Sequence, residues 1–214
     1  NLANVVLLLK SVGIHDLLNF DFLDPPPTDT LIRSLELLYA LGALNDRGEL
    51  TKLGRRMAEF PVDPMMSKAI LASEEYHCTE EVLSIVAMLA ESASLFFRPK
   101  DKKVHADRAR QLFIRPGGDH FTLLNIWDQW VESGYSQVFC LDHFLQPQTL
   151  GRVRDERDQL VNLCERVELV PESRLSSADL TPIQKAITAG YFMNTARLQK
   201  GGETYRSIKQ NTTV

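Results

Sequence analysis

Apolar residues recur every three or four positions over most of the chain, and this spacing constrains the fold more than any other feature of the sequence. In the stretch that follows the three prolines at 25–27, the recurring residues are Leu31, Leu35, Leu38 and Leu41. Such spacing places the apolar side chains on one face of an α-helix. Before the C-terminal tail, no segment longer than about five residues shows the alternating or β-branched pattern that is typical of strands. The sequence therefore predicts a mainly α fold.

The first 72 residues are predicted to form a winged helix, in which a small hairpin lies beside the third of three helices. The helices are expected over residues 2–12, 28–41 and 52–60. Thr28 or Asp29 is expected to cap the second helix and Thr51 the third, because short oxygen-bearing side chains accept from free helical N–H groups. The hairpin is predicted around Asn45-Asp-Arg-Gly48, since glycine suits the positive φ of a tight turn.

A winged helix can place a helix in the major groove of DNA. The candidate helix here offers Arg55 and Arg56 and little else that could read bases. We therefore interpret this region as a packing module.

Further helices are expected after the first 72 residues. The longest of them is expected over 149–167, with an inner row made of Leu150, Val153, Arg157, Leu160, Cys164 and Val167. Arg157 interrupts an otherwise apolar row, and a buried arginine is costly unless it is paired or hydrogen-bonded. Two interpretations stay open. Arg157 either reaches the surface or a carboxylate partner, or this flank of the helix lines a polar channel.

The chain changes character after a polar stretch at 171–181, which is an expected boundary. A helix is predicted over 182–197. The segment Tyr205–Val214 carries the one convincing strand-and-turn pattern of the sequence. Residues 181–214 are therefore interpreted as the beginning of a further domain that contains a sheet.

Charge is distributed unevenly along the sequence. The formal net charge is −4 and the pI is near 5.8, so the chain as a whole lacks the basic character of a nucleic-acid-binding protein. Between Arg98 and Arg115, however, seven basic residues stand against two acidic ones. This segment is either a solvated face or a binding surface. The longest apolar run near the start, Val5–Leu9, is far too short to span a membrane.

The sequence lacks the patterns of a complete active site. Cys78, Cys140 and Cys164 are too few and too scattered for a disulfide framework, which suits a reducing compartment. Cys140 and His143 have metal-ligand spacing, but no second pair is near and we predict no metal site. There is no G-x-x-x-x-G-K-[ST] phosphate loop and no G-x-G-x-x-G. We therefore expect no ATP site and no enzyme activity in these residues, and we expect the chain, which begins at Asn1, to be a fragment.

The best candidate site is the stretch Arg115-Pro-Gly-Gly-Asp-His120. Asp119 is the expected N-cap after Gly117 and Gly118, and the free N–H groups of a first helical turn favour an anion. One row of the following helix is polar and uncharged, and its members are Thr122, Asn125 and Gln129. Such a row suits contacts with sugars, phosphates and base edges. His120 is interpreted either as part of this site or as a half-buried histidine, and the two tryptophans of the helix as core residues.

Five segments of the sequence are distinctive when they are taken together. They are Phe20-Asp-Phe-Leu-Asp-Pro-Pro-Pro27, Gly54-Arg-Arg-Met-Ala-Glu-Phe-Pro61, Phe97-Arg-Pro-Lys-Asp-Lys102, Gly117-Gly-Asp-His120 and Lys185-Ala-Ile-Thr-Ala-Gly-Tyr-Phe192. With these segments the chain resembles the C-terminal region of DEAH-box RNA helicases, essentially over its whole length. It is most similar to the pre-mRNA-splicing member that acts before the first catalytic step, with the relative that releases mRNA as the alternative.

The resemblance implies an order of domains: a winged helix (1–72), a ratchet-like helical bundle (73–180) and the start of a truncated oligonucleotide-binding fold (181–214). It implies that two RecA-like domains of the parent chain bind ATP and Mg²⁺ and hydrolyse ATP. The C-terminal domains would close a tunnel over single-stranded pre-mRNA. The implied partners are RNA, a glycine-rich G-patch activator and the spliceosome, with no membrane contact, and the implied location is the nucleus.

The resemblance also implies which residues contact RNA. They are Arg98, Lys100, Gly117, Gly118, Asp119, His120, Thr122, Asn125, Arg152, Arg154 and Arg157. The last three match the arginine-rich helix of the family, from which this sequence departs at Gly151 and Glu156. The competing interpretation is a helical protein-interaction scaffold without direct RNA contact, which the net acidity and the missing catalytic motifs favour.

Overall fold

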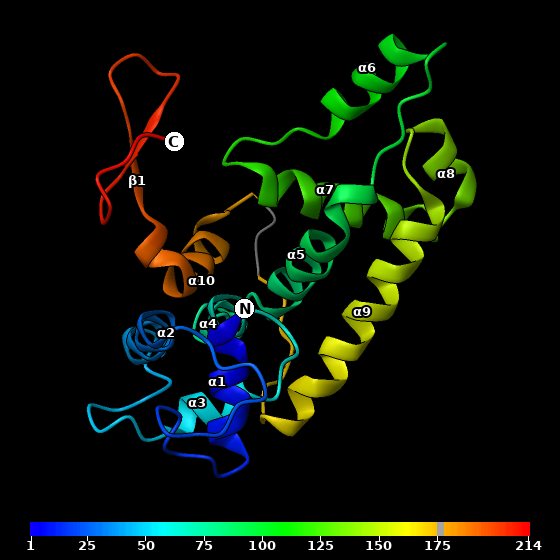
Figure 1. The fold of residues 1–214 in the computed structure, drawn as a ribbon. Helices are drawn as coiled ribbons and strands as arrows, with labels where there is room; N and C mark the ends of the chain where they lie inside the picture. Colours follow the sequence, from blue (N-terminus) through cyan, green and yellow to red (C-terminus); the bar gives the residue numbers. More distant parts are fainter. Residues whose placement is uncertain (175–177) are drawn as a thin grey trace. The chain divides into compact units, whose positions relative to one another are not determined.

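The computed structural model describes residues 1–174 and 178–214, and most of their regular structure is helical (Figure 1). The chain divides into two compact units. Among the described residues, unit 1 comprises 1–77 and 178–214, and unit 2 comprises 78–174. The mainly α prediction is confirmed. None of the described helices is long and apolar enough to cross a membrane.

Unit 1 is built from short helices. They are α1 (Leu2–Ser11), α2 (Thr28–Ala40), α3 (Lys52–Met57), α4 (Pro64–Ala72) and α10 (Thr181–Tyr191). Thr51 caps α3 as predicted, because its Oγ1 accepts from the N–H of Gly54 at 3.0 Å. The predicted cap of α2 is wrong. Pro27 holds the N-cap position and no side chain of the described residues caps this helix, so Thr28 and Asp29 lie inside its first turn.

The predicted hairpin between α2 and α3 is reduced to a single β-bridge, which joins Leu44 and Leu50. Gly48 lies in the turn with a φ of 74°, as the sequence predicted. Lys10 of α1 supports this turn, because its Nζ donates to the carbonyl oxygens of Gly48 at 2.7 Å and of His15 at 3.1 Å. Burial lowers the pKa of Lys10, and these hydrogen bonds offset part of the cost of burying its charge. The turn is therefore fastened to the first helix.

Helix α10 packs against α4 within unit 1. The two backbones approach so closely that a Cβ on Gly190 would lie 2.1 Å from the carbonyl oxygen of Met65. Space, rather than an unusual backbone angle, therefore requires glycine at this position. Asp63 and Pro64 start α4, since the Asp63 side chain accepts from the N–H of Met65.

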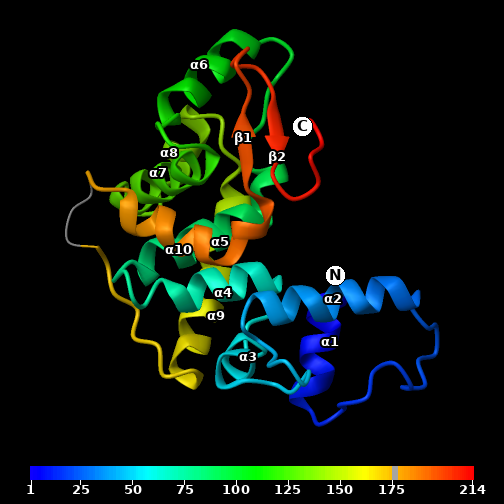
Figure 2. The same ribbon diagram turned by 90° about the vertical axis from the view of Figure 1, so that its left-hand side faces the viewer.

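A small sheet follows α10 and a 3-10 turn (Phe192–Asn194). Strands β1 (Ala196–Leu198) and β2 (Tyr205–Ser207) pair antiparallel (Figure 2). In their register Arg197 lies opposite Arg206. A bridge from Arg206 to Thr213 extends the pattern. The strand-and-turn prediction for the tail is confirmed, and this sheet fits the start of an oligonucleotide-binding fold.

Unit 2 is a helical bundle. Its elements are α5 (Thr79–Glu91), the 3-10 turn Ser92–Ser94, α6 (Lys103–Phe113), α7 (Asp119–Glu132), α8 (Gln137–Asp142) and α9 (Pro147–Arg166). Helix α5 packs against both α7 and α9. The chain returns to the start of α5 after α9, because the Glu80 N–H donates to the carbonyl oxygen of Glu172 at 2.9 Å. The polar stretch predicted as a boundary includes residues 175–177, which lie outside the described residues.

The core of unit 2 contains residues from each of the helices α5 to α9, and α6 contributes its last residue, Phe113. Its members include Met88, Phe113, Ile126, Trp127, Trp130, Leu150 and Val153. Both tryptophans are therefore core residues, as predicted. The inner row of α9 is also confirmed, since Leu150, Val153, Leu160, Cys164 and Val167 are buried and Arg157 is mostly buried among them.

Candidate nucleic-acid interface

Two glycines turn the chain from α6 into α7. Gly117 and Gly118 have φ values of 103° and 115°, a region that other residues rarely adopt. Gly118 holds the N-cap position of α7, so the prediction that Asp119 is the N-cap is wrong by one residue. Asp119 lies instead in the first turn, where its carboxylate faces the positive end of the helix dipole. The free N–H groups of this turn remain a feature that attracts anions, although Asp119 already supplies one negative charge.

The polar row of α7 holds the preceding segment in place. Thr122 Oγ1 accepts from the backbone N–H of Arg115 at 3.2 Å, and Asn125 Oδ1 accepts from the Arg115 guanidinium at 3.1 Å. Asn125 Nδ2 donates to the carbonyl oxygen of Phe113 at 3.0 Å, and Gln129 Nε2 donates to Asn125 Oδ1 at 3.0 Å. Much of the hydrogen-bonding capacity of the row is therefore used inside unit 2. Its direct effect is to hold Arg115 beside the first turns of α7.

His120 is half-buried at the start of α7. Burial lowers its pKa, and the neighbouring charge of Asp119 opposes that shift only in part. The imidazole is therefore mostly neutral at pH 7, with one ring nitrogen that can donate and one that can accept a hydrogen bond. Both interpretations of His120 remain compatible with this position.

Arg98 lies in the segment that leads into α6, and it is already paired. Its Nε donates to Asp107 Oδ1 and its Nη2 to Asp107 Oδ2, both at 2.8 Å. Phe97 anchors the same segment, because its N–H donates to the carbonyl oxygen of Phe144 at 3.0 Å. Lys100 is exposed two residues beyond Arg98. A basic, solvent-exposed edge therefore surrounds the entry to α6.

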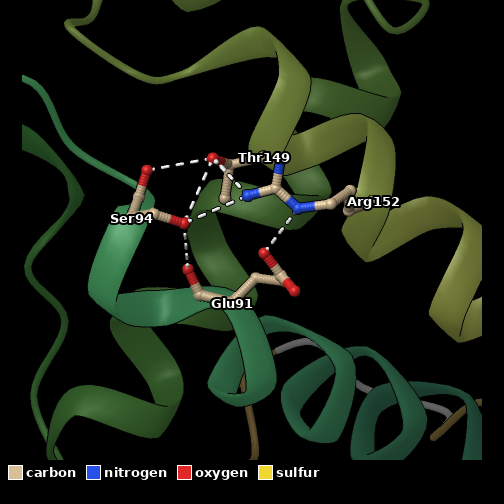
Figure 3. A network of polar contacts seen from close by, with 4 residues as sticks. All are labelled: Glu91, Ser94, Thr149 and Arg152. Atoms are coloured by element: carbon tan, nitrogen blue, oxygen red, sulfur yellow. Dashed lines mark hydrogen bonds and ion pairs between the residues drawn. The ribbon is translucent and has the colours of Figure 1, made fainter.

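Arg152 connects α9 with the end of α5. Its Nε donates to Glu91 Oε2 at 2.8 Å, and its Nη2 donates to Ser94 Oγ at 3.2 Å and to Thr149 Oγ1 at 3.3 Å. Figure 3 shows that these groups converge on one side of the guanidinium, with the Thr149 hydroxyl also donating to the Ser94 carbonyl oxygen at 3.0 Å. Arg152 therefore has a structural role in unit 2.

Arg154 and Arg157 lie on other faces of α9. The guanidinium of Arg154 is exposed and stacks on Tyr135, 4.1 Å from the ring centroid. Arg157 donates to Ser84 Oγ at 2.8 Å, pairs with the Glu80 carboxylate, and lies 5.5 Å from the ring centroid of Trp127. The predicted pairing of Arg157 with a carboxylate is confirmed.

Arg157 also lines a polar pocket of unit 2, with a volume of about 480 Å³. The other lining residues are Glu80, Glu81, Ser84, Leu124, Trp127, Asp128, Pro171 and Ser173. Burial raises the pKa of Asp128, and Glu81 adds to that shift while Arg174 and Arg157 oppose it. The pocket therefore also fits the second interpretation of Arg157, in which this flank of the helix lines a polar space.

The predicted RNA-binding residues do not gather at one place. Arg154 contacts Tyr135, just beyond the C-terminal end of α7, whereas Gly117–His120 lie at its N-terminal end. A helix of 14 residues is about 21 Å long. The structure thus separates an α9 group from a group at the start of α7, and single-stranded RNA would have to pass along unit 2 to contact both.

Sequence reasoning missed two residues that shape these groups. Asp107 pairs with Arg98, and Glu91 pairs with Arg152 at 2.8 Å. A pairing of Asp107 could have been suspected from the sequence, because it is the only acidic residue within 103–113, the range that forms α6. The sequence offered no such indication for Glu91, since it lies 61 residues from its partner. Among the described residues, no group of three or more His, Cys, Asp or Glu side chains could hold a metal ion.

Comparison with protein families adds two matches. Residues 34–62 match the helicase associated domain (HA2), winged-helix, and residues 63–123 match the helicase associated domain (HA2), ratchet-like. Residues 34–123 are therefore similar to two successive helicase-associated domains. These domains are found in DEAH/RHA helicases, where they form C-terminal accessory modules and associate with RNA and RecA-like domains. The ratchet-like match includes the basic segment and extends into α7.

Proposed function

We propose that this chain is the C-terminal accessory module of an ATP-dependent RNA helicase of pre-mRNA splicing, and that it helps to close a tunnel over single-stranded RNA. The observation that carries this proposal is the direct succession of a winged-helix match and a ratchet-like match at residues 34–123. The parent chain would bind ATP and Mg²⁺ in its RecA-like domains and would act in the nucleus as part of the spliceosome. The residues of this chain would hold RNA and regulate the enzyme, whereas the RecA-like domains would hydrolyse ATP.

The RNA-facing surface would be the exposed basic edge at α6 together with the first turn of α7. Lys100 and Arg98 are exposed there, and Arg115 is held beside α7 by Thr122 and Asn125. Cations of this kind neutralise phosphates without reading sequence, which suits an enzyme that translocates along any RNA. The acidic net charge of the whole chain is compatible with such a local site, because exposed charges farther away than about 10 Å are largely screened.

The test uses Lys100→Ala, with Lys52→Ala in the first turn of α3 as the matched control. Both lysines are exposed, and both substitutions remove one positive charge. Lys100→Ala should weaken binding of single-stranded RNA equally for different sequences and should lower the slope of log K against log salt by about 0.7. In the full helicase it should also raise the RNA concentration needed for half-maximal ATPase activity. Equal effects of the two substitutions would contradict the assignment of the surface.

A groove of unit 1 supports the part of the proposal that concerns a G-patch activator. It has a volume of about 480 Å³ and its apolar lining residues include Leu17, Leu18, Leu35, Tyr39 and Leu44. Leu18 and Tyr39 are 59% and 56% exposed, which leaves apolar surface for a partner. Leu18→Asp should weaken binding of a G-patch peptide, whereas Val170→Asp, at an exposed apolar residue of unit 2, should not. Unchanged binding by both variants would remove this groove from the proposal.

One observation favours the second candidate, a protein-interaction scaffold without RNA contact. Arg98, Arg152 and Arg157 each already have a carboxylate partner within the described residues. Binding assays with RNA and with a G-patch peptide separate the two functions. Peptide binding without any salt-dependent RNA binding would support the scaffold.

A further inference from the structure

We propose that Asp107 occupies the phosphate-binding face of Arg98 and is displaced when single-stranded RNA binds. This inference rests on the proposed RNA-binding function and adds a regulatory contact to the same surface. The pair would let the basic edge of α6 exchange an internal anion for an RNA phosphate.

The geometry of the pair is that of a bound oxyanion. Both carboxylate oxygens of Asp107 accept from the guanidinium of Arg98, Oδ1 from Nε and Oδ2 from Nη2, at 2.8 Å each. Arginine binds phosphate through the same planar fork of donors. A phosphate that approached this face would therefore compete with Asp107 for the same N–H groups.

The pair is also accessible. The side chains of Arg98 and Asp107 are 56% and 50% exposed, so solvent and an incoming strand can reach both. Exposed ion pairs contribute little to stability. Opening this one should leave the fold of unit 2 intact.

The charges around Asp107 indicate why its carboxylate acts as an anion. It is the only acidic residue of α6, which also carries Lys103, Arg108 and Arg110. The hydrogen bonds from Arg98 lower the pKa of Asp107, with smaller contributions from Arg110 and Lys103. Asp107 is therefore ionised at neutral pH, and it neutralises part of the surface that a phosphate would otherwise meet. An alternative role, in which Asp107 holds Arg98 in the correct position for RNA, predicts the opposite effect of removing it.

The test measures binding of a fluorescein-labelled polyuridine strand to the 214-residue chain by fluorescence anisotropy at about 50 to 200 mM salt. The test variant is Asp107→Asn. The matched control is Asp101→Asn, which makes the same charge change in the exposed turn before α6, at a residue that has no ion pair within the described residues. Each substitution is also made together with Arg98→Ala. Circular dichroism melts verify that every variant is folded.

Both substitutions should tighten RNA binding, and the gain in affinity should be up to about fivefold larger for Asp107→Asn than for Asp101→Asn. This excess should disappear when Arg98 is alanine, while the smaller effect of Asp101→Asn persists. Weaker binding by Asp107→Asn would overturn the inference in favour of a positioning role, and equal effects of the two substitutions would overturn it outright. The proposed function fails separately, if the unmodified chain shows no salt-dependent binding at all.

Discussion

Replacing Gly190 by alanine introduces one methyl group at the closest approach of α10 to α4. The new Cβ would lie 2.1 Å from the carbonyl oxygen of Met65 and 3.1 Å from the backbone nitrogen of Ala69. Both neighbouring atoms belong to the backbone of α4, so no side-chain rotation can relieve the contact. The two helices have to separate, and the packing between them is lost in part.

The magnitude follows from two opposing contributions. Overpacking of a tight contact costs about 3 kcal/mol at the upper end of the usual range. Alanine in place of glycine in a helix returns roughly 1 kcal/mol. The net loss of unfolding free energy is therefore about 2 kcal/mol, which corresponds to a decrease in Tm of roughly 4 to 8 °C for a chain of this size.

Gly151 provides the matched control, because it also lies in a helix and a Cβ there would meet nothing within 4 Å. Gly151→Ala should raise the unfolding free energy by up to about 1 kcal/mol. Thermal and urea unfolding, followed by circular dichroism, can measure whether the unfolding free energy decreases in Gly190→Ala and increases in Gly151→Ala. If Gly190→Ala were as stable as the unmodified chain, the close packing of α10 on α4 would be wrong.

Three further predictions concern buried polar groups. Arg157→Ala should lower the unfolding free energy, measured by urea titration, by about 2 kcal/mol, because it removes charged hydrogen bonds made by a side chain that is 16% exposed. The control Arg154→Ala should lower it by no more than about 1 kcal/mol. Burial raises the pKa of Cys78 to about 12 and that of Cys164 to about 11, so neither thiol should react with iodoacetamide in the folded protein at pH 8. The stability that the neutral thiols provide should decrease as the pH rises above about 8.5, where the thiols of the unfolded chain ionise. Rapid labelling of either thiol would refute this. Burial lowers the pKa of His120, so its contribution to stability should be lost as the pH falls below about 6.5, and an NMR titration that gave a pKa above 6.5 would contradict it.

Local patterns in the sequence were sufficient to predict the helices and several of their details. The spacing of apolar residues predicted the buried row of α9. For Arg157, the exception in that row, a carboxylate partner was one of the interpretations left open, and the structure shows that partner to be Glu80. The Gly48 turn and the strand at Tyr205 were likewise predicted from local patterns. The buried row, the turn and the strand each depend on residues that are close in sequence.

Contacts between distant residues could not be predicted in this way. Glu80 lies 77 residues from Arg157, and nothing in either local pattern links them. The packing of Gly190 on Met65 likewise joins residues that are far apart in the chain. The N-cap of α7 was misplaced for a different reason. Asp119 has the better capping side chain, but Gly118, with its positive φ, holds the N-cap position, so the helix begins at Asp119, one residue earlier than predicted.

The site residues were predicted mainly from a resemblance, and the structure adds what they contact. Arg98, Arg152 and Arg157 were expected to face RNA, and each has an internal carboxylate partner. Only the exposed pair of Arg98 leaves both partners half accessible. This difference ranks Arg98 above the other two as a phosphate contact.

In the function proposed above, unit 2 contacts single-stranded RNA through the basic edge of α6 and the start of α7. This contact can be tested by ultraviolet crosslinking of a thiouridine-substituted strand to the proposed full-length helicase, followed by mass spectrometry of the crosslinked peptides. Crosslinks are expected within residues 98–120. Crosslinks confined to unit 1, or an absence of crosslinks from this chain while the RecA-like domains are labelled, would contradict it.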